Sequence, residues 1–360
     1  KAVLSTEIHC LSIHRVVISI SWRPQLDSKF TALFTPECVK RHSRRNHMKQ
    51  TEKRFAFAGK RIAALPEAAI SQQGMDVYGS LAFLLHHGGS CDVLHLNTKQ
   101  KVSSFHLASY TGDGAGPYTN HANQAVFCSR LTPYQPSGAL PLMYVSIGNG
   151  PGADEDGYYG RCAVEQICIK NEALSSELLQ TISYCDNNEP KAEDGRYLYY
   201  PSYEPPCWGL PAFFPNTSKR LLYLFSARYR TTLQEYDCKN AYLVTVFSLP
   251  DVYSANAVIY GPSNILDQMA FPYDFSVTQG GTLYGKYLIQ AFGFGTAENP
   301  NGILIFDLDA RKTVCRIDLS HSVFATKELE DCAIWRNALV CNTRDGCVYE
   351  LCSNFDMLIR

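Results

Sequence analysis

The sequence has little of what marks a membrane protein, a nucleic-acid-binding protein or a secreted protein. No apolar stretch reaches the roughly 18–20 residues that a bilayer-spanning helix needs. The formal net charge is −1, which argues against nucleic acid as the main partner because phosphate binding requires a basic face. Residues 10–22 are interrupted by His14 and Arg15, so they lack the apolar core of a signal peptide. These absences predict a soluble, cytoplasmic protein without a membrane span.

Metal-binding and disulfide patterns are also missing, although the chain has 14 cysteines. No Cys-x-x-Cys pair occurs, and the densest run, Cys332, Cys341, Cys347 and Cys352, has no zinc-site spacing. Several of these cysteines fall inside apolar strand patterns, where a thiol behaves as a small hydrophobic group. We therefore interpret them as buried free thiols in a reducing compartment.

Familiar catalytic motifs are absent as well. The sequence contains no Gly-x-Ser-x-Gly nucleophile elbow. The glycine-rich run at residues 148–152 is followed by no clear helix, so it does not form a phosphate-binding P-loop. The chain therefore shows no local motif of an enzyme, and we favour a protein without catalytic activity.

The first 47 residues differ in composition from the rest and carry a basic cluster at residues 40–45. We interpret residues 1–47 as a disordered or mis-called extension, with a basic arm for anionic surfaces as the alternative. Residues 48–360 are expected to form a single domain.

That domain contains an internal repeat. Residues 73–79 read Gln-Gly-Met-Asp-Val-Tyr-Gly, and residues 279–285 read Gln-Gly-Gly-Thr-Leu-Tyr-Gly. A third copy begins at Glu330, and weaker copies open at His121 and near Cys207. The copies start near 73, 121, 207, 279 and 330, and the shorter intervals are close to the periods of about 40–50 residues that are typical of β-propellers.

Each copy continues into short apolar runs that turn signals separate, as in antiparallel hairpins. We expect strands at residues 77–85, 91–96, 102–107, 142–147, 162–169, 178–183, 221–226, 241–249, 286–292, 303–308, 314–319, 337–342 and 347–351.

These patterns predict an all-β protein, a β-propeller with five blades. Residues 54–65 alternate in polarity, and we expect them to supply the outer strand of the last blade and so close the ring. A six-bladed propeller, with one blade hidden in 184–260, and a pair of β-sandwiches are the alternatives. The sandwich does not explain the recurring opening phrase.

The chain resembles bacterial propellers of the WD40-like and YncE-like type over about residues 50–355. The resemblance rests on the Gln-Gly-x-x-x-Tyr-Gly phrase, on His121-Ala122-Asn123 and on residues 328–331, which read Glu-Leu-Glu-Asp. The Gly-His and Trp-Asp dipeptides of WD40 repeats are missing. The resemblance implies a scaffold that binds a ligand or partner, with some lactonase-like or glycan-directed enzymes among such proteins.

A site is expected where the innermost strands of the blades begin, because they converge at one end of the channel. Amides, carboxylates, one imidazole and one indole would suit a polar small molecule, a glycan or a protein. The expected ligand-binding residues are His121, Asn123, Trp208, Glu330, Asp331, Gln73 and Gln279. The two glutamines have an alternative interpretation, in which they shape the turn between blades by bonding to nearby backbone.

The function that follows is a monomeric, non-catalytic propeller that binds its ligand at the channel mouth. No cofactor is expected. A weaker alternative is a lactonase-like or glycan-processing hydrolase or lyase that uses the carboxylates and the imidazole. Calcium would then be held by oxygen ligands from Glu330, Asn123, Asp274 and Asp76.

Overall fold

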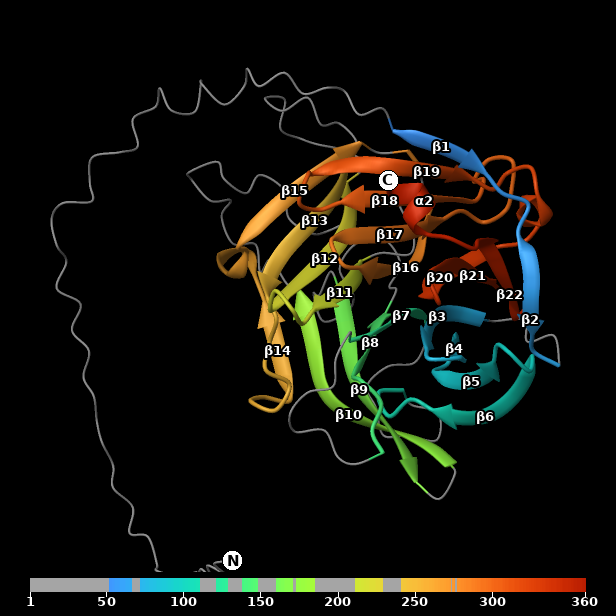
Figure 1. The fold of residues 1–360 in the computed structure, drawn as a ribbon. Helices are drawn as coiled ribbons and strands as arrows, with labels where there is room; N and C mark the ends of the chain where they lie inside the picture. Colours follow the sequence, from blue (N-terminus) through green and yellow to red (C-terminus); the bar gives the residue numbers. More distant parts are fainter. Residues whose placement is uncertain are drawn as a thin grey trace, which may run out of the picture. The chain divides into compact units, whose positions relative to one another are not determined.

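The repeat folds as five β-sheets around one centre (Figure 1). The structure is a computed structural model, and it describes residues 52–66, 72–110, 121–128, 138–147, 160–170, 173–184, 211–228, 241–272, 274–275 and 277–360. The described strands belong to the unit Thr51–Arg360. The expectation for residues 1–47 lies outside the described residues.

Each sheet, here called a blade, runs from a central strand to an edge strand. Blade 1 holds β3 (Gln72–Tyr78), β4 (Leu81–His86), β5 (Ser90–His95) and β6 (Gln100–His106). Blade 2 holds β7 (Ala122–Phe127), β8 (Met143–Ile147), β9 (Gly160–Lys170), β10 (Ala173–Tyr184) and β14 (Ala257–Tyr260). Blade 3 holds β11 (Ala212–Asn216), β12 (Leu221–Arg228), β13 (Ala241–Ser248) and β15 (Asp267–Pro272).

The last two blades take in the N-terminal strands. Blade 4 holds β16 (Thr278–Tyr284), β17 (Tyr287–Phe292), β18 (Gly302–Asp307), β19 (Lys312–Asp318) and β1 (Lys53–Ala56). Blade 5 holds β20 (Leu329–Trp335), β21 (Ala338–Thr343), β22 (Cys347–Cys352) and β2 (Lys60–Ala64), and a short helix, α2 (Asp356–Ile359), follows β22. The strand order confirms the predicted five-bladed β-propeller.

Side chains become more exposed from the inner strand of a blade to its edge strand. The inner strand β7 is buried at every residue, whereas the edge strand β6 of blade 1 is mostly exposed. Five hydrophobic clusters fill the spaces between neighbouring blades. Because each cluster takes residues from at least two blades, the blades stabilise one another by burying apolar surface.

The opening phrase of the repeat is itself the inner strand, which the sequence interpretation had missed. Residues 77–85 were expected to form one strand, but β3 ends at Tyr78 and β4 begins at Leu81. Gly79 lies between them with φ +63°, a conformation that glycine adopts without steric cost. Gly285 takes φ +62° at the same point of blade 4, so 286–292 contains the second strand of that blade.

The N-terminal segment closes the ring, as predicted, and it reaches two blades. β2 pairs antiparallel with β22 as the outer strand of blade 5. β1 pairs in parallel with β19, from Lys53 opposite Cys315 to Ala56 opposite Asp318, so it adds a fifth strand to blade 4. Figure 1 shows both strands along the outer edge of these blades. One segment therefore covers two sheet edges that would otherwise be open.

No additional blade forms among the described residues of the 184–260 region. Strands β11, β12 and β13 belong to blade 3, and β14 pairs in parallel with β10 of blade 2. β14 was not expected from the sequence, and it comes from the connection between β13 and β15. The six-bladed alternative is therefore wrong.

Candidate functional site

Four of the five inner strands begin with a β-bulge, and four predicted site residues lie at these bulges. The pairing register shifts near the start of β3, β7, β16 and β20. A bulge adds a residue to one strand and redirects its side chain, and bulges are common beside binding sites. The residues at the four bulges, here called the entry ring, are Gln73, Asn123, Gln279 and Glu330. All four are buried, with exposed fractions of 9%, 5%, 4% and 1%.

Glu330 is the most unusual member of the entry ring. Its Oε1 has no hydrogen-bond partner within the described part of the chain, although the side chain is fully buried. Burial raises the pKa of its carboxyl well above the ordinary value, the neighbouring Glu328 raises it further, and Arg344 lowers it. Burial therefore favours the protonated form of this carboxyl. A buried polar atom without a partner calls for an explanation, and a bound molecule is one of the few available.

The two glutamines of the ring bond to nearby backbone. Gln73 donates from Nε2 to the carbonyl of Gln72 at 3.1 Å. Gln279 donates from Nε2 to the carbonyl of Gly293 at 3.1 Å and to the carboxylate of Glu328 at 3.4 Å. These contacts are the ones that the alternative interpretation of the Gln-Gly phrase predicts. A ligand-binding role for either residue stays a prediction.

Asp331 fills the centre just past the entry ring. Its Oδ2 accepts hydrogen bonds from the backbone N–H of Met75 at 2.8 Å and of Ala125 at 3.3 Å, and its Oδ1 accepts from Cys332 at 2.7 Å. A Cβ atom at Gly280 would lie 2.2 Å from Cγ of Asp331. The Asp331 carboxyl of blade 5 therefore occupies the space beside Gly280 of blade 4 that a larger residue would fill. The same carboxyl bonds to the backbone of blades 1 and 2.

Gln124 also bonds across the centre. Its Nε2 donates to the carbonyl of Gly281 in blade 4 at 2.9 Å, and its Oε1 accepts from the Ser146 hydroxyl at 2.7 Å. That hydroxyl in turn accepts from the backbone N–H of Phe213 in blade 3 at 2.8 Å. Strands β7 and β16 touch although their blades are not neighbours. Side chains and backbone from non-neighbouring blades therefore meet directly at the centre of the propeller.

The other predicted residues have separate surroundings. His121, with φ +52°, precedes β7, and its ring lies 4.3 Å from that of His87 in the turn between β4 and β5. Asp76 accepts from the backbone N–H groups of Val77 at 2.7 Å and Phe127 at 2.6 Å, and burial raises its pKa to about 7. Trp208 lies outside the described residues.

The carboxylates proposed for calcium are not gathered at one point. Asp274 forms an ion pair with Arg316, and Asp76 is directed at the backbone of blade 2. Among the residues that the structure describes, no three His, Cys, Asp or Glu side chains are grouped so as to hold a metal ion. The geometry therefore offers no support for a calcium site built from Glu330, Asn123, Asp274 and Asp76.

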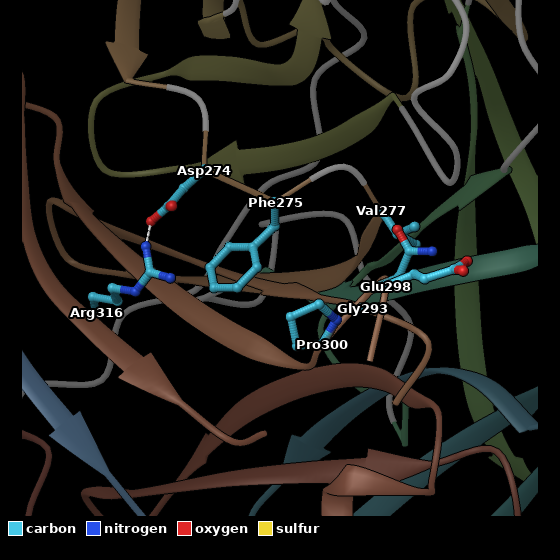
Figure 2. A pocket seen from close by; sticks show the side chains of 8 residues that line it. Asp274, Phe275, Val277, Gly293, Glu298, Pro300 and Arg316 are labelled. Carbon is cyan, nitrogen blue, oxygen red and sulfur yellow. Dashed lines mark ion pairs between the residues drawn. The ribbon is translucent and has the colours of Figure 1, made fainter. Parts of the chain in front are cut away.

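The Asp274–Arg316 pair borders a pocket that sequence reasoning missed (Figure 2). The pocket lies between the segment that leads from blade 3 into β16 and the loop between β17 and β18. Asp274 and Arg316 are 42 positions apart, and neither belongs to a recognisable motif. The sequence therefore carried no signal that could bring them together.

Comparisons with known proteins add little to this geometry. A scan against protein-family models finds no match, and a search of curated proteins finds none. The chain is similar to the glutaminyl cyclase of Myxococcus xanthus, with 10% identity and a TM-score of 0.37 over 83% of this chain and 97% of that one. It is also similar to a tail fiber of Staphylococcus aureus phage P68, with 12% identity and a TM-score of 0.39 over 84% of this chain and 54% of that one. Similarities this distant carry no functional argument.

In the part of the chain that the structure describes, no helix is both long and apolar enough to cross a membrane. The class that the strand pairing defines is the five-bladed β-propeller.

Proposed function

We propose that the protein binds a polar small molecule, of the size and character of a sugar, at the entry ring. The observation that carries the proposal is the buried Glu330 carboxyl, whose Oε1 has no hydrogen-bond partner among the described residues. Leaving a buried polar group unpaired costs about 1–3 kcal/mol of stability. A ligand hydroxyl that bonds to Glu330 recovers this energy, so the site favours a hydrogen-bonding ligand over an apolar one.

The surroundings of Glu330 support recognition of a polar ligand. Asp331 and Gln124 bond across the centre to the backbone of other blades, which holds the inner strands that carry the ring in fixed positions. Burial favours the protonated form of this carboxyl, which both donates and accepts a hydrogen bond and so matches a hydroxyl group. A non-catalytic binding role agrees with the resemblance of the repeat to bacterial WD40-like and YncE-like propellers.

The test is thermal unfolding of the full chain with a panel of neutral monosaccharides and disaccharides, each at millimolar concentration. At 100 times its Kd, a ligand adds about 2.7 kcal/mol to the free energy of unfolding, which raises Tm by several degrees. We expect at least one sugar to do so in the native protein. The shift should be largely lost in Glu330→Leu, whose side chain fills a similar volume but neither donates nor accepts a hydrogen bond.

Glu177→Leu is the matched control, because Glu177 is an exposed carboxylate on β10. It should show the same Tm shift as the native protein. The proposal fails if no sugar in the panel raises Tm, or if Glu330→Leu responds as strongly as the control.

A further inference from the structure

A pocket of about 210 Å³ opens between blades 3 and 4. This volume is below the roughly 300–1,000 Å³ of sites that take drug-sized ligands, so it fits a small metabolite. The pocket, here called the Arg316 pocket, is lined by Asp274, Phe275, Val277, Gly293, Glu298, Asn299, Pro300 and Arg316.

One end of the pocket is an ion pair. Arg316 bonds through one guanidinium nitrogen to Oδ2 of Asp274, and the two side chains are 25% and 33% exposed. The guanidinium also lies over the Phe275 ring, 4.7 Å from its centroid. Because a guanidinium carries five N–H donors in a fixed fork, Arg316 can hold Asp274 and still address a second carboxylate.

The middle of the pocket is apolar. In Figure 2 the Phe275 ring lies between the Asp274–Arg316 pair on one side and Val277 and Glu298 on the other, with Pro300 below it. Such a surface fits the hydrocarbon part of a small molecule. A charged group at the ion pair and an apolar body over the ring can therefore be bound together.

The walls are held in place before any ligand arrives. The Tyr242 hydroxyl accepts from the backbone N–H of Phe275 at 2.6 Å and of Asp274 at 3.2 Å, and it donates to the Phe275 carbonyl at 2.8 Å. On the other side, Gly293 has φ +103°, and its N–H donates to the carbonyl of Val277 at 3.1 Å. A preformed site loses less conformational entropy on binding.

The charges of the lining select among small ligands. Arg316 contributes one positive charge, and Asp274 and Glu298 each contribute one negative charge. A simple anion would have to compete with Asp274 for Arg316 inside a lining that is net negative. A molecule with both charges avoids this competition, because its carboxylate pairs with the guanidinium while its ammonium faces Asp274.

We propose that the Arg316 pocket binds a zwitterionic α-amino acid with an apolar side chain. Its carboxylate bonds to Arg316, its ammonium faces Asp274, and its side chain packs on Phe275 and Pro300. The Arg316 pocket and the entry ring share no residue, although they adjoin where Gln279 donates to the Gly293 carbonyl. The amino-acid proposal does not rest on the sugar site.

The test is isothermal titration of the full chain with L-phenylalanine, L-leucine and L-methionine. Two capped compounds are the probes of charge: N-acetyl-L-phenylalanine lacks the ammonium, and L-phenylalaninamide lacks the carboxylate. At least one free amino acid should bind, and each cap should weaken binding at least about tenfold, as expected when a charge-assisted hydrogen bond is lost.

Arg316→Gln should weaken binding of the free amino acid at least about tenfold. Arg311→Gln is the matched control and should leave the affinity unchanged, because Arg311 is also an arginine paired with an aspartate, Asp267, away from the pocket. If Arg316→Gln does not fold, Asp274→Asn is used in its place. Asp274→Asn should weaken binding of the free amino acid, and it should leave binding of N-acetyl-L-phenylalanine unchanged because that compound has no ammonium.

Several results would overturn the assignment. They are the absence of binding for all three amino acids at millimolar concentration, equal binding of the capped and free compounds, and unchanged affinity in the pocket variant. Loss of amino-acid binding in Glu330→Leu would also overturn it, because the ligand would then sit at the entry ring. Retained binding in Glu330→Leu supports two sites.

Discussion

The Asp331 carboxylate on β20 accepts a hydrogen bond from the backbone N–H of Met75 on β3, at 2.8 Å. The two residues are 256 positions apart, and the bond joins the last blade to the first at the centre of the propeller. β2 joins blade 5 to the N-terminal segment at the outer edge. Blade 5 is therefore joined to the N-terminal part of the chain twice. The Asp331 side chain makes the link at its inner strand, and β2 makes the link at its outer edge.

Gly280→Ala should destabilise the protein by about 1–3 kcal/mol, because an added methyl group would overlap the Asp331 carboxyl. Asp331 is held by three backbone N–H groups and cannot easily move aside. Gly88→Ala is the control, since no described residue lies within 4 Å of the corresponding position. Urea unfolding of both variants measures the difference. Equal stability of the two would show that the centre is not tightly packed.

Stability should fall as the pH rises from about 4 to about 7. Burial raises the pKa of Asp76 from 3.8 to about 7, so the folded protein retains a proton that the unfolded chain releases in this range. The contribution is fully present below about pH 4 and is lost as the pH passes 7, a difference of up to about 4 kcal/mol. Burial also raises the pKa of Asp331 and Glu330, which adds to the trend.

Urea unfolding across this range should show the decline in the native protein and a shallower decline in Asp76→Asn. The carboxyls whose pKa is lowered, such as those of Asp307 and Asp345, change their contribution below about pH 4 and do not mask the effect. Stability that is flat or rises over the same range would contradict the prediction.

Ile62→Ala should destabilise the protein by about 2–4 kcal/mol. Ile62 is a buried residue of β2, and it packs in the cluster between blades 5 and 1. Lys60→Ala, in the same strand but exposed, should change stability by less than about 0.5 kcal/mol. If both variants match the native protein in urea unfolding, β2 is not needed to close the ring.

The cysteines should react slowly with a thiol reagent while the protein is folded. Nine of them are free and buried in the described residues, and burial raises the pKa of Cys128 and of Cys315 to about 12. The thiolate is the reactive form of cysteine. Burial therefore slows the reaction in two ways, because it shields the sulfur from the reagent and raises the pKa of the thiol. Of the 14 cysteines, no more than five should react quickly at about pH 8, and the remainder should react only after unfolding in guanidinium. Fast reaction of more than five would contradict the structure.

The blade count and the starts of most blades could be predicted because hairpins are local. Gly79 and Gly285 mark the same turn in two blades, and Gly346 marks a third hairpin, each with positive φ. Parallel additions such as β1 on β19 could not be predicted. Lys53 pairs with Cys315 across 262 positions, and an edge strand of this kind has no turn beside it to reveal its partner.

The residues of the entry ring were also predictable, since Gln73, Gln279 and Glu330 recur at one point of the repeat. What the sequence could not say is which polar side chains bond to backbone and which remain without a partner. Asp331 follows Glu330 directly, yet the structure gives its carboxyl three backbone N–H partners. Glu330 Oε1 has none in the described residues.

The sequence alone therefore determined the propeller and where most of its blades begin, because turn glycines, strand alternation and the repeat all act over short distances. Only the tertiary structure decided that Asp331 bonds to the backbone of two other blades and that Arg316 meets Asp274 beside Phe275. The physical reason is that these contacts join side chains and backbone from different blades. They exist only once the blades have packed against one another.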